Sequence, residues 1–173
     1  IFIVSSMPSV RTVPRTGWCR PGGGSPVFVL PARTIGPAGA EVVRLDMDPP
    51  PTIYGARGTL EGWRELVARL AVGNSRLAFG ISCGLAAPLL FLAGDEGGGI
   101  NLRGESSKGK TTIIDAAASV SGPPSKTGPD AFVRPWRATS NALEQVAAAH
   151  NHALLPMDEM GQADPKELGE TLY

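Results

Sequence analysis

Hydrophobic and polar positions follow a short-period pattern in the first third of the chain. In residues 1–58 the apolar runs are brief and lie between Gly- and Pro-rich turns, as in Phe2–Val4 and Val27–Leu30. Such runs predict short strands, because glycine supplies positive φ and proline fixes φ at the turns. A further strand is expected at the end of Gly36–Leu45. We therefore predict a small β-rich N-terminal module, followed by a stiff proline-rich connector at Asp46–Thr52.

From residue 59 the apolar spacing becomes helical. Thr59 is a suitable N-cap and Gly73 a suitable end for a helix with apolar positions every three or four residues: Leu60, Trp63, Leu66, Val67 and Leu70. Asn74 can cap a second helix that contains the uncharged stretch Leu77–Ala93. This stretch is shorter than the about 20 residues of a bilayer-spanning helix. We expect it to be a helix buried under a sheet.

The second half alternates between expected strands and helices. The strands are Gly99–Arg103, one within Phe132–Trp136, and Ala153–Glu159; the helices are Lys110–Val120, Asn141–Ala149 and a last one capped by Asp164. This alternation is typical of a parallel sheet covered by helices. Residues 59–173 are thus predicted to form one α/β domain with a parallel-sheet core.

The string GESSKGKT at Gly104–Thr111 fits the pattern G-x-x-x-x-G-K-[ST] of a P-loop at every fixed position. In such a loop the glycines let backbone amides point at phosphate oxygens, and the next helix adds its positive N-terminal end. Lys110 is expected to reach the β- and γ-phosphates of ATP, and the Thr111 hydroxyl to ligate Mg²⁺. The expected binding residues are Gly104, Glu105, Ser106, Ser107, Lys108, Gly109, Lys110, Thr111 and Thr112.

Two carboxylates follow the apolar run that begins at Ala153. A P-loop enzyme needs a carboxylate at the end of a neighbouring strand to hold Mg²⁺, a role predicted for Asp158. Glu159 is placed to orient or deprotonate the attacking water, so Glu159 and Lys110 are the predicted catalytic residues. Pro156 lacks the amide that a central strand donates, and could therefore slow turnover.

Composition narrows the remaining chemistry. The 16 basic and 16 acidic residues balance, so net charge gives no argument for nucleic-acid binding. Two cysteines and two histidines stand in no metal-ligand spacing, which makes a structural zinc unexpected. His150 and His152 follow a helix and are expected to cap its carbonyls. Near Trp136, the side chains of Arg137, Thr139 or Asn141 could sense a nucleotide or touch DNA, although Thr139 and Ser140 also suit a helix cap.

The order of motifs resembles the domain-of-unknown-function nine-two-seven family. The resemblance rests on TGW, VFVLP, IGPAG, GTLEGWRELVARLAVGNSRLAFGISCGLAAPLL, GGINLRGESSKGKTT, AASVSG, WRATSNALE and AAAHNHALLPMDEMGQADPKELGE. It runs from about Thr16 to the end of the chain. The family pattern has an unbroken aliphatic strand before the acidic pair, from which Pro156 departs.

This resemblance implies a helicase-like P-loop ATPase of phage, plasmid and integrative-element replication. The implied fold is a P-loop NTPase core of the RecA-like, ASCE type, C-terminally truncated here. The implied partners are single-stranded or forked DNA, further copies of the chain in a ring, and a primase module. A cytoplasmic location without a membrane is expected, and this fragment alone is expected to be inactive.

Two other functions remain open at this point. A P-loop small-molecule kinase or other phosphotransferase would use Glu159 on an acceptor hydroxyl. A nucleotide-binding regulatory module with little turnover would fit the position of Pro156.

Overall fold

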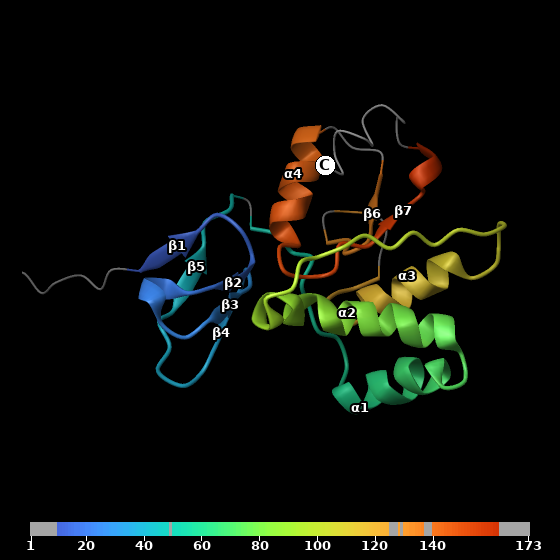
Figure 1. The fold of residues 1–173 in the computed structure, drawn as a ribbon, viewed down its shortest axis with the longest axis horizontal. Coiled ribbons are helices and arrows are strands. Elements are labelled where there is room, and N and C mark those ends of the chain that lie inside the picture. Colours follow the sequence, from blue (N-terminus) through green and yellow to red (C-terminus); the bar gives the residue numbers. More distant parts are fainter. Residues whose placement is uncertain (1–9, 49, 125–127, 129, 137–139, 163–173) are drawn as a thin grey trace, which may run out of the picture.

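The computed structural model describes residues 10–48, 50–124, 128, 130–136 and 140–162. Its first part, residues 10–48, is called the N-terminal module below; it holds five short strands (Figure 1). In one sheet β1 (Arg11–Val13) pairs in parallel with β5 (Val43–Leu45). The other sheet is antiparallel in the order β2–β3–β4, with bounds Gly17–Cys19, Val27–Val29 and Thr34–Ile35.

The β-rich character of this module agrees with its sequence pattern. The strands expected at Val27–Leu30 and at the end of Gly36–Leu45 are confirmed, whereas Phe2–Val4 lies outside the described residues. Val27 and Val29 are fully buried because alternate residues of a strand point to the same face. They pack with Val43 to form the small core of the module. A 3₁₀ turn, η1 (Pro21–Gly23), links β2 to β3.

The first helical segment begins and ends where the sequence predicts. It comprises α1 (Leu60–Trp63), a π-helical turn η2 (Arg64–Ala68) and a 3₁₀ turn η3 (Arg69–Ala71). The Thr59 hydroxyl accepts a hydrogen bond from the Gly62 amide at 3.0 Å, which caps the first turn. After Gly73, at φ +79°, the Asn74 side chain caps α2 by accepting from the Leu77 amide at 3.2 Å.

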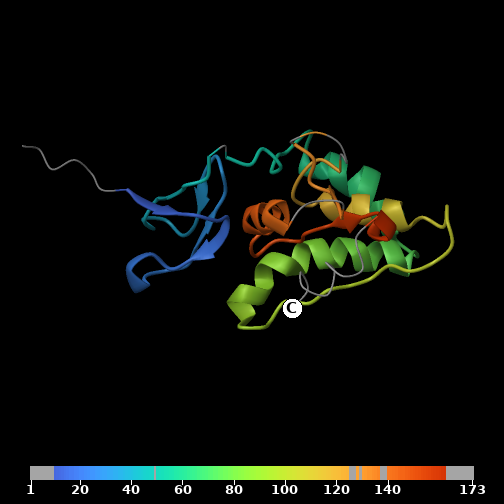
Figure 2. The same ribbon diagram turned by 90° about the horizontal axis from the view of Figure 1, so that it is seen from above.

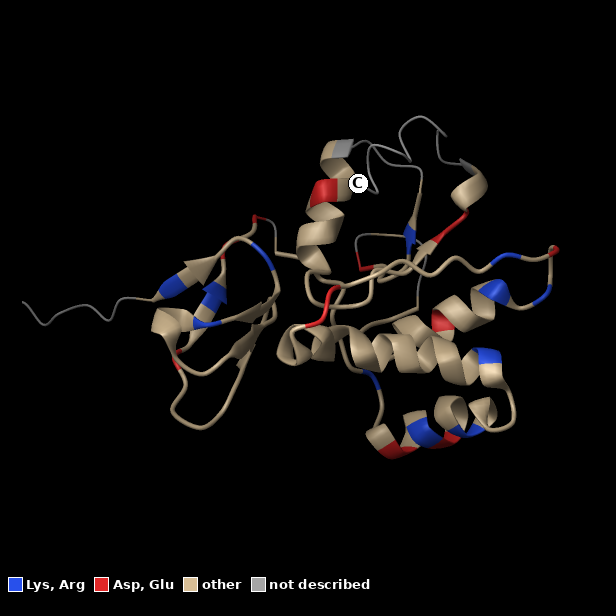
Figure 3. Cartoon of the chain, in the orientation of Figure 1, with Lys and Arg blue, Asp and Glu red and all other residues tan. Residues whose placement is uncertain are grey.

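Helix α2 (Ser75–Ala93) exists as predicted, but the expectation that it is buried under a sheet is wrong. Its buried residues are Gly80, Ile81 and Gly84, while Phe79, Leu85, Leu89 and Leu92 are exposed. Hydropathy records only that a segment is apolar and carries no information on what covers it. By length and composition α2 is the single helix among the described residues that could cross a membrane, which is weak evidence for a span. Figure 3 shows how few charges α2 carries beside the charged α1 segment.

Small residues bring α2 close to α3 (Lys110–Ala118), which lies alongside it in Figures 1 and 2. A Cβ added to Gly80 would come within 2.7 Å of the Ile113 side chain. A Cβ added to Gly84 would come within 2.7 Å of the Ala117 carbonyl oxygen. Both positions therefore need glycine, because any side chain would push the two helices apart.

The remaining elements form a second, smaller parallel pair. Strand β6 (Arg134–Pro135) leads to α4 (Ser140–Ala149), and β7 (Met157–Asp158) pairs with β6 in parallel before η4 (Met160–Gln162). The predicted strand at Ala153–Glu159 is thus limited to two residues. The predicted strand at Gly99–Arg103 is wrong, because this segment has no secondary structure. The expected Asp164-capped helix lies outside the described residues.

A shared core joins these elements to the connector. Ile53, Ala118, Phe132, Val133 and Ala149 are buried together, and Met47 of the expected connector packs against them, so the connector reaches the core of the second part. Gly122 fits here because an added Cβ would press on the Ile53 carbonyl oxygen and the Phe132 ring. The fold is therefore mixed α/β, with short sheets, two of which are parallel pairs.

Candidate functional site

The Gly104–Thr111 loop runs into the first turn of α3. Gly109 is the N-cap of α3 at φ +81°, a conformation that favours glycine. Ser107 also has positive φ, +58°, which is uncommon for a residue with a side chain. The loop therefore curls tightly just before the helix begins. An added Cβ on Gly104 would meet nothing within 4 Å, so contacts within the folded chain do not require glycine there.

The N-terminus of α3 is open to an anion. Gly109 makes no side-chain cap, and the first turn contains no acidic residue. The first backbone amides of a helix lack partners within the helix and carry its positive dipole end. The other predicted binding residues are exposed along the loop and this turn: Glu105, Ser106, Ser107, Lys108 and Thr112. The carboxylate of Glu105 lies 3.9 Å from the ammonium of Lys108.

Lys110 bends back over the loop. Its Nζ donates to the carbonyl oxygens of Gly104, at 2.7 Å, and Glu105, at 2.6 Å. A lysine ammonium offers three donors. The two carbonyl oxygens are exposed, so water can replace the ammonium as their hydrogen-bond donor. The ammonium group is thus held against the backbone at the start of the loop.

Thr111 and Asp158, far apart in the sequence, meet at the start of α3. The Thr111 hydroxyl donates to Asp158 Oδ2 at 3.2 Å. The other carboxylate oxygen, Oδ1, accepts from the Glu159 amide at 2.8 Å. Glu159 adopts φ +63° and its side chain is exposed. Non-glycine residues with positive φ are often found at functional sites. The structure therefore brings three predicted site residues together.

Pro156 does not interrupt the strand pair that carries Asp158. Its carbonyl oxygen accepts from the Arg134 amide at 2.9 Å, and the Asp158 carbonyl accepts from the Trp136 amide at 3.2 Å. The β6–β7 hydrogen bonds use the Pro156 carbonyl and leave its missing amide without consequence for this pairing. The register of the two strands therefore allows β6 and β7 to pair despite Pro156.

The hydroxyl and carboxylate oxygens of this site suit a hard divalent cation whose other ligands are supplied by water and substrate. Within the residues described, no group of three or more His, Cys, Asp and Glu side chains is arranged to hold a metal. Mg²⁺ commonly takes only one or two protein oxygens, together with phosphate oxygens and water. Thr111 Oγ1 and Asp158 Oδ2, 3.2 Å apart, are such a pair.

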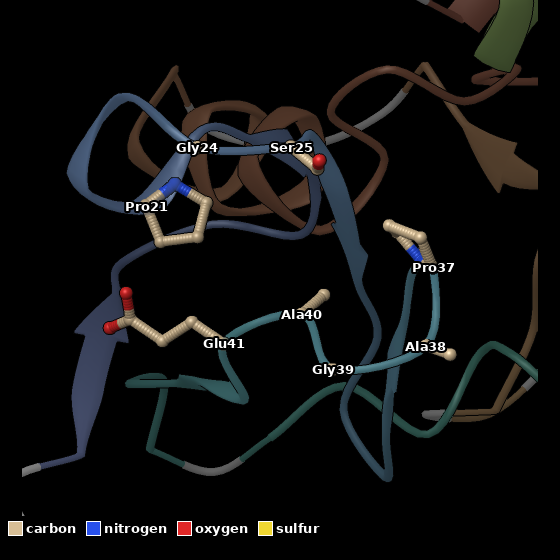
Figure 4. Close-up of a pocket in the computed structure, with 8 residues that line it drawn as sticks. All are labelled: Pro21, Gly24, Ser25, Pro37, Ala38, Gly39, Ala40 and Glu41. Carbon is tan, nitrogen blue, oxygen red and sulfur yellow. The ribbon is translucent and has the colours of Figure 1, made fainter.

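Other predicted residues lie away from this site. Arg137 and Thr139 are outside the described residues, and Asn141 is exposed on α4. His150 is buried and its Nδ1 lies 2.8 Å from the Val146 carbonyl oxygen, which confirms the capping role expected of His150; His152 Nδ1 instead accepts from the Trp18 amide at 3.0 Å. A hollow of about 290 Å³ lies within the N-terminal module (Figure 4). It is lined between Pro21 and Glu41 and shares no residue with the loop.

Sequence reasoning missed a set of polar contacts made to the end of α4 by the N-terminal module and by Tyr54, which follows the connector. Thr16, Trp18 and Tyr54 all donate hydrogen bonds to the end of α4 or the turn after it. Thr16 and Trp18 flank Gly17 in the TGW string, and Gly17 has φ +96°. A single glycine between two hydrogen-bond donors is a weak sequence signal for these contacts, because the acceptors lie more than 130 residues away along the chain.

Comparison with known proteins identifies the family but no characterised relative. The family described as "Domain of unknown function (DUF927)" matches residues 2–173, and the chain belongs to this family. No curated protein matches the chain. No solved structure matches it either.

Proposed function

We propose that this member of DUF927 binds ATP together with Mg²⁺ at the Gly104–Thr111 loop, as a P-loop NTPase does. The observation that carries the proposal is the hydrogen bond from Thr111 to Asp158, 47 positions along the chain. A hydroxyl after the loop lysine and a carboxylate at a strand end are the two protein oxygens that such enzymes use for Mg²⁺. Their meeting is not explained by a chance Gly- and Ser-rich surface turn.

Three features of the loop support phosphate binding. The uncapped α3 N-terminus supplies amide donors and a positive dipole end. The Lys110 ammonium, held on two loop carbonyls, can exchange these acceptors for phosphate oxygens. The positive φ values at Ser107 and Gly109 turn the backbone tightly, as needed for successive amides to converge on an anion.

Hydrolysis would fall to Glu159. Its exposed carboxylate follows Asp158 directly, where it can accept a proton from a water molecule that attacks the γ-phosphate. When bound, Mg²⁺ would draw negative charge from the phosphate oxygens and so ease the displacement. Lys110 would hold the same oxygens as their charge develops. The further assignment, a cytoplasmic DNA helicase motor of a mobile element that acts as a ring, is proposed on the family resemblance alone.

Nucleotide binding by purified variants tests the site. Lys110→Ala is expected to weaken ATP binding by about a hundredfold or more, since it removes a charge-assisted contact to phosphate. Glu159→Gln is expected to bind ATP normally and to release no phosphate. Isothermal titration calorimetry and a phosphate-release assay measure the two quantities.

Arg103→Ala is the matched control, because it removes one positive charge next to the loop without touching a proposed ligand. Its ATP affinity should stay close to that of the unaltered protein. Equal affinities for the unaltered protein, Lys110→Ala and Arg103→Ala would overturn the proposal. Transfer of phosphate to a metabolite in place of release to water would favour the kinase alternative.

A further inference from the structure

The C-terminal end of α4 is capped by residues of other segments. The last four carbonyls of a helix have no partner within it. In α4 the carbonyls of Val146 and Ala147 accept from the His150 amide, both at 3.1 Å. The Ala148 carbonyl accepts from the Thr16 amide at 3.2 Å. The N-terminal module therefore completes the end of this helix.

Ala149, the last residue of α4, is held from two sides. Its carbonyl oxygen accepts from the Thr16 hydroxyl at 2.8 Å and from the Tyr54 hydroxyl at 2.9 Å. Thr16 is 1% exposed, so its hydroxyl has no access to water as an alternative partner. Burial raises the pKa of Tyr54 to about 12, which keeps this phenol a donor at physiological pH. Loss of either donor would leave a buried polar group less well satisfied.

The turn after α4 is bound to the same edge of the module. The Trp18 amide donates to His152 Nδ1 at 3.0 Å, and the Asn151 side-chain amide donates to the Thr16 carbonyl at 2.8 Å. His152 itself adopts φ +56°. We call residues Thr16–Trp18 the docking edge and Asn151–His152 the α4 turn. Because the Trp18 N–H needs a lone pair on Nδ1, the ring proton of His152 is on Nε2.

Gly17 makes this close approach possible. Its φ is +96°, and an added Cβ would lie 2.9 Å from His152 Nδ1 and closer still to the Asn151 carbonyl oxygen. Any other residue would therefore push the docking edge away from the α4 turn.

The docking edge also holds α2. Trp18 Nε1 donates to the Pro88 carbonyl at 2.6 Å, and the Trp18 ring stacks on Phe91 with centroids 6.3 Å apart. Figures 1 and 2 show the module against the end of α4 and the C-terminal end of α2. Since α2 packs on α3 through Gly80 and Gly84, the module contacts α4 and also α2, the helix that packs against the one following the Gly104–Thr111 loop.

We propose that the docking edge positions Asp158 for its metal ligand role. The α4 turn is followed directly by the segment that enters β7, so its placement fixes where Asp158 meets Thr111. The edge does not touch the nucleotide; it acts through the turn, in the way that outer residues orient metal ligands. This inference rests on the proposed function, because it concerns the Mg²⁺-dependent part of ATP binding.

The test compares two glycine substitutions in the same module. Gly17→Ala introduces the clash with the α4 turn, whereas Gly39→Ala imposes a similar positive-φ strain, at φ +77°, with nothing within 4 Å of the added Cβ. ATP affinity is measured by calorimetry with Mg²⁺ and with EDTA. Gly17→Ala should lower the ratio of the two affinities by about tenfold, the scale of outer-residue effects on metal sites. It should leave the affinity in EDTA unchanged.

Gly39→Ala should keep the ratio of ATP affinity with Mg²⁺ to ATP affinity with EDTA that the unaltered protein shows. Asp158→Asn removes the proposed metal ligand itself and gives the reference ratio for its loss. Equal ratios for Gly17→Ala and Gly39→Ala would overturn the positioning role. A fall of both affinities in Gly17→Ala would also overturn it, since a general loss of structure weakens the loop as well. If Gly17→Ala does not fold, Thr16→Val takes its place, because it removes a hydroxyl donor without a backbone clash.

Hydrogen exchange without nucleotide separates this proposal from the proposed function. The Glu159 amide donates to Asp158 Oδ1, so its exchange rate reports the placement of that carboxylate. Gly17→Ala should speed exchange at Glu159, and Gly39→Ala should not. A protein that binds no ATP yet shows this difference would disprove the ATP site and keep the positioning role. Identical exchange in both variants would disprove the positioning role.

Discussion

At the joint between the N-terminal module and α4, polar groups are buried and paired, whereas along the Gly104–Thr111 loop they are exposed. Thr16 has its amide, hydroxyl and carbonyl all in hydrogen bonds across the joint. On the loop, Lys110 binds two carbonyls and the first amides of α3 have no side-chain cap. The joint is therefore built to hold a shape, and the loop to accept a ligand.

The difference shows how rigidity and reactivity are divided in this molecule. A buried hydrogen bond is costly to break because its groups cannot turn to water. An exposed donor exchanges water for a ligand at little cost. Loops with open donors work best when a rigid scaffold places them. Here the chain runs from the joint into the segment that carries Asp158, and the loop leads into the first turn of α3.

The largest expected effect comes from the core that supports both regions. Phe132 is fully buried, contacts Tyr54 and His150 at ring distances of 5.6 and 4.8 Å, and lies two positions before β6. Phe132→Ala should lower the free energy of unfolding by about 3–5 kcal/mol, through lost burial and the cavity that remains. Urea denaturation measures it. As a control on the loop, Ser106→Ala should change the value by less than about 0.5 kcal/mol.

A smaller effect isolates the joint. Thr16→Val keeps the shape of the side chain and removes its hydroxyl, while Tyr54 still donates to Ala149. The free energy of unfolding should fall by about 1 kcal/mol, the usual value of one hydrogen bond. Thr112→Val makes the same change at an exposed position of α3 and should leave stability unaltered. Equal effects of the two substitutions would contradict the contrast between joint and loop.

The smallest effect is a pH dependence of the joint. Burial, with a lesser contribution from the Arg15 charge, lowers the pKa of His152, and burial also lowers the pKa of His150. The unfolded chain then binds protons more readily than the folded one. The contribution of the two neutral histidines to the free energy of unfolding should be fully present above the unfolded pKa of about 6.5. It should decline as pH falls toward the lower folded pKa values. Above pH 7 these groups contribute no further change.

His152→Gln separates the two histidines. Denaturation at several pH values between about 5 and 7 should show a shallower decline in this variant, because only His150 continues to titrate. A decline as steep as that of the unaltered protein would show that the His152 ring takes no part in it. The slope difference is expected to be modest, since His152 is only half-buried.

Features set by neighbouring residues are the ones that sequence predicts well here. The caps at Thr59 and Asn74 and the positive φ at Gly109 follow from side-chain type and the missing Cβ of glycine. The P-loop pattern led to Thr111, and the apolar run from Ala153 that ends in two carboxylates led to Asp158; the structure joins these two residues. By contrast, Gly99–Arg103 is apolar enough for a strand, but a strand needs a partner to form hydrogen bonds, and no strand among the described residues pairs with it.

By itself, then, the sequence determined the family, the helix ends and the residues of the candidate nucleotide site, because each depends on local conformation or on a short motif. Tertiary structure alone decided that α2 is largely exposed and that Thr16 and Trp18 close the end of α4 and its turn. For Thr16 and Trp18 the physical reason is that their contacts join residues more than 130 positions apart. No local pattern records which buried carbonyl a distant donor will satisfy.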